Sequence, residues 1–133
     1  MARQFSTAAR NAALDAMETA IGVSPTLELR TGAPPATCAT ADSGTVLATM
    51  ILPSDWLGAA AAGVKALSGT WQDLAADAAG TVGHFRLKQG ATCHDQGTVT
   101  ITGGGGDMTI DNPVLALNQQ VSVTSFTLTA GGA

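Results

Sequence analysis

Tyrosine is absent from this sequence, and phenylalanine and tryptophan together make up only 4% of its 133 residues. Charged residues are also scarce, at 12%, whereas apolar residues reach 45%. Because a chain of this composition can bury a core, an intrinsically disordered protein is excluded. No apolar run approaches the roughly 20 residues that a membrane-spanning helix needs, so we expect no membrane partner. The length favours one domain.

Positive charge is in short supply. Six Lys and Arg residues stand against ten Asp and Glu, and the formal net charge is −4. Proteins that hold nucleic acid through its phosphates need a basic surface, so we expect no nucleic-acid partner.

Cysteine is limited to Cys38 and Cys93, which are too few for a disulfide-rich secreted scaffold. The first residues also lack the apolar stretch of a secretion signal. We therefore expect a protein made in a reducing cytoplasm, with two small, half-buried thiols. A disulfide between Cys38 and Cys93 is the alternative.

One amphipathic helix is predicted near the N-terminus, over residues 7–21. Ser6 can cap its first turn, Gly22 can adopt the left-handed conformation that ends a helix, and Pro25 prevents continuation. Apolar residues recur at helical spacing at Leu14, Met17 and Ile21. A helix of this length is marginal alone, so residues 1–25 are expected to dock on the sheet or on another subunit.

Strands are predicted after this helix, where the period of apolar residues changes from helical to alternating. Leu27 and Leu29 alternate with polar residues, whereas residues 46–52 are apolar on both faces, as in a strand covered twice or open to a partner. A change of parity in the last strand predicts a β-bulge near residues 124–125. We expect a mainly β fold, in which residues 26–133 form a jelly-roll-like antiparallel β-sandwich of about eight strands after the one helix.

No catalytic or metal-binding pattern is present in the sequence. Cysteine and histidine lack the short ligand spacings of zinc sites, and no Gly-x-Ser-x-Gly elbow offers a nucleophile. The glycine run at 103–106 is followed by strand residues rather than by a helix, so it predicts a flexible hairpin loop instead of a phosphate cradle. We expect no enzyme, no cofactor and no metal.

Two features point to contacts with a partner. His84, Arg86 and Lys88 share the polar parity of one strand, which is typical of a solvated strand face and also fits a contact row for an acidic partner. Trp56 and Leu57 lie among small residues in a predicted loop, where a large aromatic side chain either anchors an interface or packs back as a local lid.

A further pattern is carried by short segments of turn and strand residues. These are Leu29-Arg30-Thr31-Gly32 with Pro34-Pro35, Ser43-Gly44-Thr45-Val46-Leu47-Ala48, Gly83-His84-Phe85-Arg86-Leu87, Gln96-Gly97-Thr98-Val99, Gly105-Gly106-Asp107-Met108-Thr109-Ile110-Asp111-Asn112 and Gln120-Val121-Ser122-Val123-Thr124-Ser125-Phe126-Thr127-Leu128-Thr129. In this order, over most of residues 27–129, they resemble the capsid cement (decoration) proteins of tailed double-stranded-DNA bacteriophages. The family pattern has glycine where Asn118-Gln119 stands, but asparagine also tolerates a left-handed turn.

The resemblance implies a jelly-roll or related β-sandwich. It also implies that the protein binds the outer capsid surface of the virion, where it bridges major capsid subunits, and that it has no catalytic residues. Self-association as a homodimer or higher oligomer is expected of a small symmetric binder. Candidate contact residues for the capsid or for a second copy are Phe5, Leu14, Met17, Leu47, Ile51, Trp56, Leu57, His84, Arg86 and Lys88. Alternative functions are a phage tail or head-fibre adhesion module and a carbohydrate-binding β domain, although the latter usually stacks sugars on exposed aromatic side chains.

Overall fold

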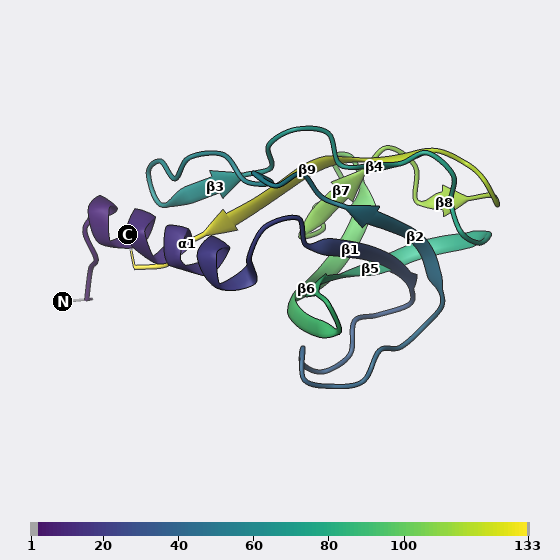
Figure 1. Ribbon diagram of the computed structural model, residues 1–133, viewed down its shortest axis with the longest axis horizontal. Helices are drawn as coiled ribbons and strands as arrows, with labels where there is room; N and C mark the ends of the chain where they lie inside the picture. Colours follow the sequence, from purple (N-terminus) through teal and green to yellow (C-terminus); the bar gives the residue numbers. More distant parts are fainter. Residues whose placement is uncertain (1–2, 133) are drawn as a thin grey trace.

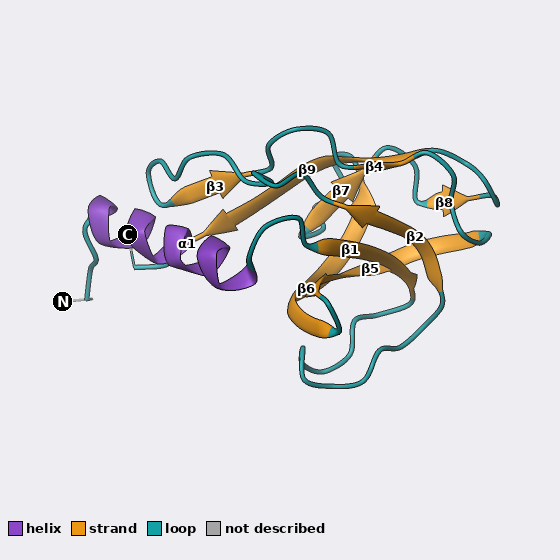
Figure 2. Cartoon of the chain, in the orientation of Figure 1, coloured by secondary structure: helices purple, strands orange, loops and turns teal. Residues whose placement is uncertain are grey.

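The computed structural model describes residues 3–132; residues 1–2 and 133, at the outer ends of the two predicted segments, lie outside the described residues. The helix and strands of this range are α1 (Thr7–Ile21), β1 (Thr26–Thr31), β2 (Val46–Ile51), β3 (Val64–Ala66), β4 (Gln72–Asp73), β5 (Gly80–Gln89), β6 (Thr92–Ile101), β7 (Met108–Ile110), β8 (Val114–Leu115) and β9 (Val121–Thr129). Figure 2 shows the helix at one end of an otherwise β-rich chain. The prediction of a mainly β fold with one N-terminal helix is confirmed.

The boundaries of α1 agree with the caps that the sequence predicts. Ser6 Oγ accepts a hydrogen bond from Ala9 N (3.1 Å), and Gly22, at φ 92°, ends the helix with its N–H on Glu18 O. Of the predicted apolar stripe, Leu14 and Ile21 are buried. Among the described residues no helix has the length and apolarity to cross a membrane.

The C-terminal end of α1 is joined by three hydrogen bonds to β5 and to the β2–β3 connection. Gln89 Nε2, at the end of β5, donates to Ile21 O (3.0 Å) and to Val23 O (2.9 Å). Trp56 Nε1 donates to Gly22 O (3.0 Å). These bonds satisfy carbonyl groups that the helix end leaves without an intrahelical partner.

The strands form one curled sheet in the order β2-β1-β5-β6-β7-β9-β3, with β4 paired to β9 and β8 paired to β5 (Figure 1). Phe85 on β5 and Phe126 on β9 demonstrate the curl, because β6 and β7 separate their strands and yet their ring centroids are 5.7 Å apart. In a flat sheet, three strand spacings would place them about 14 Å apart. The sheet therefore folds over its own core, as in a β-sandwich-like fold.

Four of the five aromatic side chains form the centre of this core. Trp71 lies between Trp56 and Phe126, with ring centroids 6.0 and 5.3 Å away. Phe126 in turn meets Phe85 edge-on. All four residues are at most 4% exposed. Aromatic side chains of such area contribute much of the burial that stabilises a small domain.

The predicted β-bulge in β9 is confirmed. Thr109 of β7 faces Ser125, but the next residue, Ile110, faces Val123, so that Thr124 has no partner across the strand. Thr124 Oγ1 instead forms a hydrogen bond with Thr109 Oγ1 at 2.7 Å.

The glycine run at 103–106 is not a hairpin loop, and that prediction is wrong. β7 pairs with β6 in parallel, with Val99 opposite Met108, so the connection must double back along β6. A Cβ atom on Gly104 would lie 2.8 Å from Thr100 Cβ, and one on Gly106 would lie 2.9 Å from Thr100 N. Only glycine permits this close return. The parallel pair departs from the expected all-antiparallel sheet.

Both outer edges of the sheet are hydrogen-bonded by the chain itself. On β2, Leu47 O accepts from Asp77 N (2.7 Å) and Thr49 N donates to the carboxylate of Asp73 (3.0 Å). On β3, Val64 and Ala61 exchange two backbone hydrogen bonds of 3.0 Å. These contacts occupy groups that an edge strand would otherwise offer to another chain.

Candidate interaction surface

The structure separates the ten candidate contact residues into two groups. Three are exposed to solvent, namely Phe5, Met17 and Ile51. Seven are buried within the chain and take part in its own packing, namely Leu14, Leu47, Trp56, Leu57, His84, Arg86 and Lys88. The buried seven offer no surface to a partner in this conformation, which corrects the expectation for each of them.

Trp56 is not an interface anchor at a loop tip. Its side chain is 0% exposed, it packs against Trp71, and its indole N–H donates to Gly22 O. Leu57 beside it is 1% exposed. This segment instead packs back on the sandwich as a local lid, which is the alternative that the sequence left open. The sequence did not reveal it because the acceptor, Gly22, lies 34 residues away along the chain.

The row formed by His84, Arg86 and Lys88 is not a solvated strand face, and that prediction is wrong. These residues are 0%, 1% and 8% exposed. The β1–β2 loop, residues 32–45, covers this face of β5 and passes below the sheet in Figure 1. The loop supplies Asp42, whose carboxylate lies 2.6 Å from Lys88 Nζ and 3.3 Å from Arg86 Nε.

Two carboxylates pair with the buried cations. Asp42 also contacts Arg30 Nη2 at 3.1 Å, and Glu28 of β1 contacts Arg30 (2.8 Å) and Lys88 (3.0 Å). The hydrogen bond from Lys88 holds the pKa of Asp42 below its usual value, and the charges of Arg30 and Arg86 act in the same direction. We call Arg30, Arg86 and Lys88 the cation row; with Asp42 and Glu28 it attaches the loop to the sheet.

The β1–β2 loop is also attached by a disulfide. Cys38 is bonded to Cys93 of β6, with the two Cα atoms 5.2 Å apart, so the expectation of two free thiols is wrong. Arg86 donates to the backbone carbonyls of Cys38 (2.6 Å) and Thr40 (3.0 Å). The sequence separation of 55 residues gave no indication of this proximity, because the loop's path is set by charges on β5.

Asp95 on β6 yields a pH-dependent prediction. Burial raises the pKa of Asp95 to about 6, and the nearby charge of Asp107 adds to this. Since the folded pKa exceeds the unfolded value of about 3.9, protonated Asp95 contributes stability below pH 4, and this is lost as the pH rises through 6. Asp95→Asn is therefore expected to raise the free energy of unfolding by about 2 kcal/mol at pH 7.5 and by almost nothing at pH 4.

Urea unfolding at both pH values measures this difference. Asp55→Asn, at an exposed carboxylate, is the matched control and should change stability little at either pH. A stabilisation by Asp95→Asn of equal size at both pH values would contradict the assignment.

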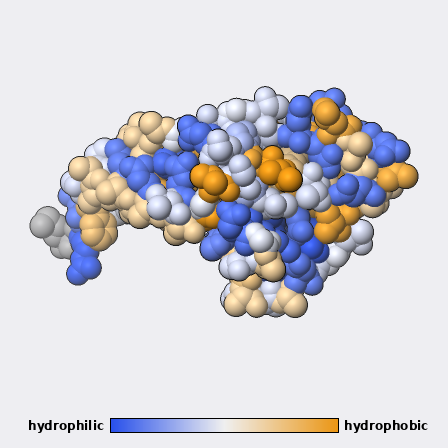
Figure 3. Space-filling view, in the orientation of Figure 1, coloured by the Kyte–Doolittle hydropathy of each residue, from blue (hydrophilic) through white to orange (hydrophobic). Residues whose placement is uncertain are grey.

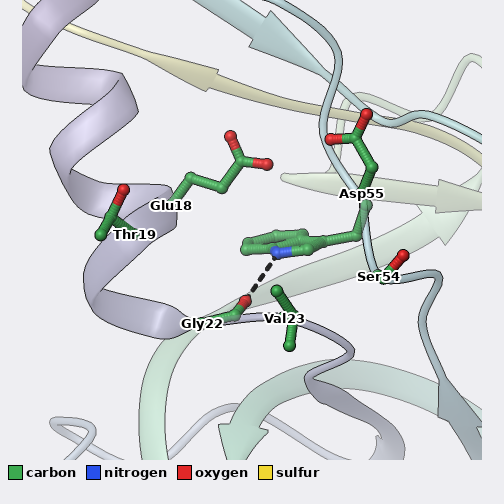
Figure 4. Close-up of a pocket in the computed structure, with 7 residues that line it drawn as sticks. Glu18, Thr19, Gly22, Val23, Ser54 and Asp55 are labelled. Carbon is green, nitrogen blue, oxygen red and sulfur yellow. Dashed lines mark hydrogen bonds between the residues drawn. The ribbon is translucent and has the colours of Figure 1, made fainter.

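A recess of about 340 Å³ lies where the C-terminal end of α1 meets the segment before Trp56 (Figure 4). Its lining residues are Glu18, Thr19, Gly22, Val23, Ser54, Asp55 and Trp56. Glu18 is bound to the buried Lys65, which also contacts Asp15 Oδ1 at 2.7 Å. Burial lowers the pKa of Lys65, but its hydrogen bonds to Asp15 and Glu18 outweigh this and raise the pKa above the usual value. A charged Lys65 thus holds α1 against β3 behind the recess.

Two large apolar side chains stand out beside the recess. Val23 on its lining is 69% exposed, and Ile51 at the end of β2 is 78% exposed. They belong to neighbouring segments, because Leu52 N donates to Pro25 O (3.0 Å) and Thr26 pairs with Ile51. Figure 3 shows hydrophobic surface over the α1–β1 connection and the end of β2, on one face and among polar atoms. We call this the Val23–Ile51 face.

The sequence pattern marks Ile51 as a candidate contact residue, and the structure shows that Ile51 is exposed, but the pattern does not mark Val23. An apolar residue directly after the glycine that ends a helix usually packs back onto the last turn. Val23 holds that position after Gly22 and yet remains exposed, and the sequence holds no signal that separates the two outcomes.

Within residues 3–132, no three His, Cys, Asp or Glu side chains are grouped as a metal site requires. Cys38 and Cys93 are joined to each other, and His84 Nδ1 lies 2.9 Å from Gly32 O. No protein-family model, curated protein or solved structure matches the chain.

Proposed function

We propose that this protein is a structural virion protein that binds the outer surface of a phage capsid and stabilises the shell by bridging major capsid subunits. The resemblance to cement proteins supports the proposal. Several of the segments that carry it form strands of the sheet. They include the end of β1, the middle of β5, and all of β7 and β9.

The observation that carries the proposal is the Val23–Ile51 face. Burying a valine or isoleucine side chain contributes about 2 kcal/mol, and these two are 69% and 78% exposed. The segments that carry Val23 and Ile51 are held in place by the hydrogen bond from Gln89 to the end of α1 and by the pairing of β1 with β2. A rigid apolar face of this kind loses little conformational entropy when a partner covers it.

The distribution of charge supports an outer location. The net charge is −4, and the cation row is buried and paired with Asp42 and Glu28. A surface with few free cations is repelled by DNA packed inside a shell and is compatible with its exterior. Because a shell repeats each binding site many times, a modest contact per copy is sufficient when one molecule spans neighbouring capsomers.

Replacing both residues of the face, in Val23→Asp/Ile51→Asp, is expected to weaken binding to preformed heads by about 100-fold or more, since each aspartate removes apolar contact and introduces charge. The measurement is co-sedimentation of purified protein with heads that were assembled from the major capsid protein without it. Thermal unfolding of the variant checks that it folds.

Ile101→Asp is the matched control. Ile101 is 53% exposed on β6, away from the face, and its replacement should leave head binding unchanged. Binding of Val23→Asp/Ile51→Asp at wild-type strength, or an equal loss in both variants, would contradict the proposed contact. Failure of the wild-type protein to bind heads would contradict the proposed function itself.

A carbohydrate-binding function is less well supported. Of the five aromatic residues only Phe5 is exposed, at 53%, whereas sugar-stacking sites use exposed aromatic platforms. A tail or head-fibre role would use the same exposed faces, and binding to tails rather than heads distinguishes it.

A further inference from the structure

Two apolar surfaces lie at opposite ends of the molecule's long axis and are not needed for the capsid contact proposed above. One is beside α1 and the other is around β8 (Figure 1). Because the chain closes both edges of its own sheet, strand addition does not explain how copies would associate. Apart from Val23, Ile51 and Ile101, the large exposed apolar side chains of residues 3–132 lie on these two surfaces.

The first surface, the α1 groove, has a volume of about 440 Å³ and lies between α1 and the last residues of β9. Its helical wall is formed by Ala9, Ala13 and Met17, at a spacing of four residues, and Phe5, just before the N-cap of α1, extends this stripe. Phe5 is 53% exposed and Met17 is 47% exposed. The groove can accept apolar side chains from outside.

Positive charge accompanies the α1 groove. Within residues 3–132, Arg3 and Arg10 form no ion pair with a described carboxylate, whereas the cation row and Lys65 are buried and paired. Arg10 lines the groove and donates only long hydrogen bonds of 3.4 Å, to Ala62 O and Thr7 Oγ1. This end of the molecule therefore presents uncompensated cations beside an apolar cavity.

The second surface, the β8 end, presents apolar side chains that protrude. Leu74, Val114 and Leu117 are 67%, 61% and 60% exposed. Leu74 and Leu117 lie on segments that are joined by hydrogen bonds between the backbones of Ala76 and residues 118–119. Figure 3 shows hydrophobic surface at this end, next to hydrophilic surface.

Negative charge accompanies the β8 end. Asp73 and Asp77 flank Leu74, and Asp111 precedes Val114 along the chain. Among the described residues none of these three carboxylates forms an ion pair, and their partners are hydroxyl and backbone N–H groups. The β8 end is thus complementary to the α1 groove in two ways. Its leucines protrude where the other surface is hollow, and its charge is negative where the charge beside the groove is positive.

We propose that the α1 groove of one copy binds the β8 end of a second copy. The two surfaces cannot meet within one chain, because they lie at opposite ends of it. Groove-to-groove and β8-to-β8 contacts would oppose like charges. A two-fold dimer that joins groove to β8 end twice would need both surfaces on one side of the molecule, whereas they lie at opposite ends of its long axis. The contact is therefore head-to-tail, which differs from the homodimer expected from the sequence. Such a contact propagates into a ring or an open chain.

Two variants, each disabling one surface, test this arrangement. Ala13→Glu fills the groove and places a carboxylate against the acidic partner surface, while glutamate retains good helix propensity. Leu74→Ser/Leu117→Ser removes the protruding leucines without a change in charge. Each variant alone should raise the dissociation constant for self-association by about tenfold or more. Sedimentation equilibrium measures the mass of each sample, and circular dichroism confirms folding.

The informative sample is an equimolar mixture of the two variants. A head-to-tail contact leaves one intact groove and one intact β8 end, so the mixture should form a dimer and nothing larger. The wild-type protein should form larger species that dissociate in high salt. A wild-type protein that stays monomeric near 1 mM, a mixture that stays monomeric, or one variant that still dimerises alone would each overturn the proposal. Val23→Asp/Ile51→Asp should self-associate like the wild type, which separates this test from that of capsid binding.

Discussion

Asp42→Ala is expected to lower the free energy of unfolding by about 3 kcal/mol, because it removes the carboxylate that all three members of the cation row share. Arg86 and Lys88 would remain 1% and 8% exposed with Glu28 as the remaining counter-charge nearby. A buried cation without a partner costs more than the intact pair contributes. For a chain of this size the loss corresponds to a decrease in Tm of about 12 °C, measured by thermal unfolding at pH 7.

The same variant makes a prediction about pH. The folded pKa of Asp42 lies below the unfolded value, so its contribution is present above pH 4 and is lost as the pH falls through the folded pKa. The difference between wild type and Asp42→Ala should therefore persist from pH 7 to pH 5 and shrink in stronger acid. Asp55→Ala, at an exposed carboxylate, should alter stability by less than about 0.5 kcal/mol. A loss that small for Asp42→Ala would show that the β1–β2 loop does not depend on these charges.

Removing the disulfide is the second large effect. Cys38→Ser/Cys93→Ser is expected to lower the free energy of unfolding by about 4 kcal/mol, since the bond closes a loop across 55 residues and restricts the unfolded chain. Urea unfolding with and without a thiol reductant provides the measurement. The reductant should destabilise the wild type and leave the double serine variant unchanged. A wild-type protein with two titratable thiols, or with equal stability under both conditions, would contradict the bond.

The two changes should not be additive, because both act on residues 32–45. Once the disulfide is absent, the loop can leave β5 more easily, and water can reach the cation row. The loss caused by Asp42→Ala should then be smaller in the Cys38→Ser/Cys93→Ser background than in the wild type. A double-mutant cycle measures this coupling, and strict additivity would show that the loop is held at two independent points.

The elements that depend on neighbouring residues could be predicted from the sequence. Ser6 and Gly22 determine the ends of α1 within a few residues, and the change of parity in β9 reveals its bulge. The glycine run at 103–106 could not be interpreted in this way. The segment returns along β6 so that β7 pairs in parallel, and contacts with Thr98 and Thr100 determine this path. A pattern of turn residues holds no information about such contacts.

The candidate site was harder to predict, because burial depends on partners that are distant in the sequence. Alternation placed Arg86 and Lys88 on the polar face of β5 correctly, but the carboxylate that allows their burial comes from Asp42, more than 40 residues earlier. Trp56 was equally ambiguous until Gly22 O could be identified as its acceptor. Ile51 became a candidate because apolar residues occur on both faces of its strand, and the structure shows that its side chain is exposed.

The three hydrogen bonds at the end of α1 have a geometric consequence for any assembly of this protein. Val23 belongs to one proposed contact and the stripe from Phe5 to Met17 to the other, and both are attached to the same helix. Gln89 and Trp56 hold the C-terminal end of that helix, and Lys65 holds its middle through Asp15 and Glu18. The tilt between successive copies, and hence the radius of curvature of the layer they form, would follow from the side chains of these three residues.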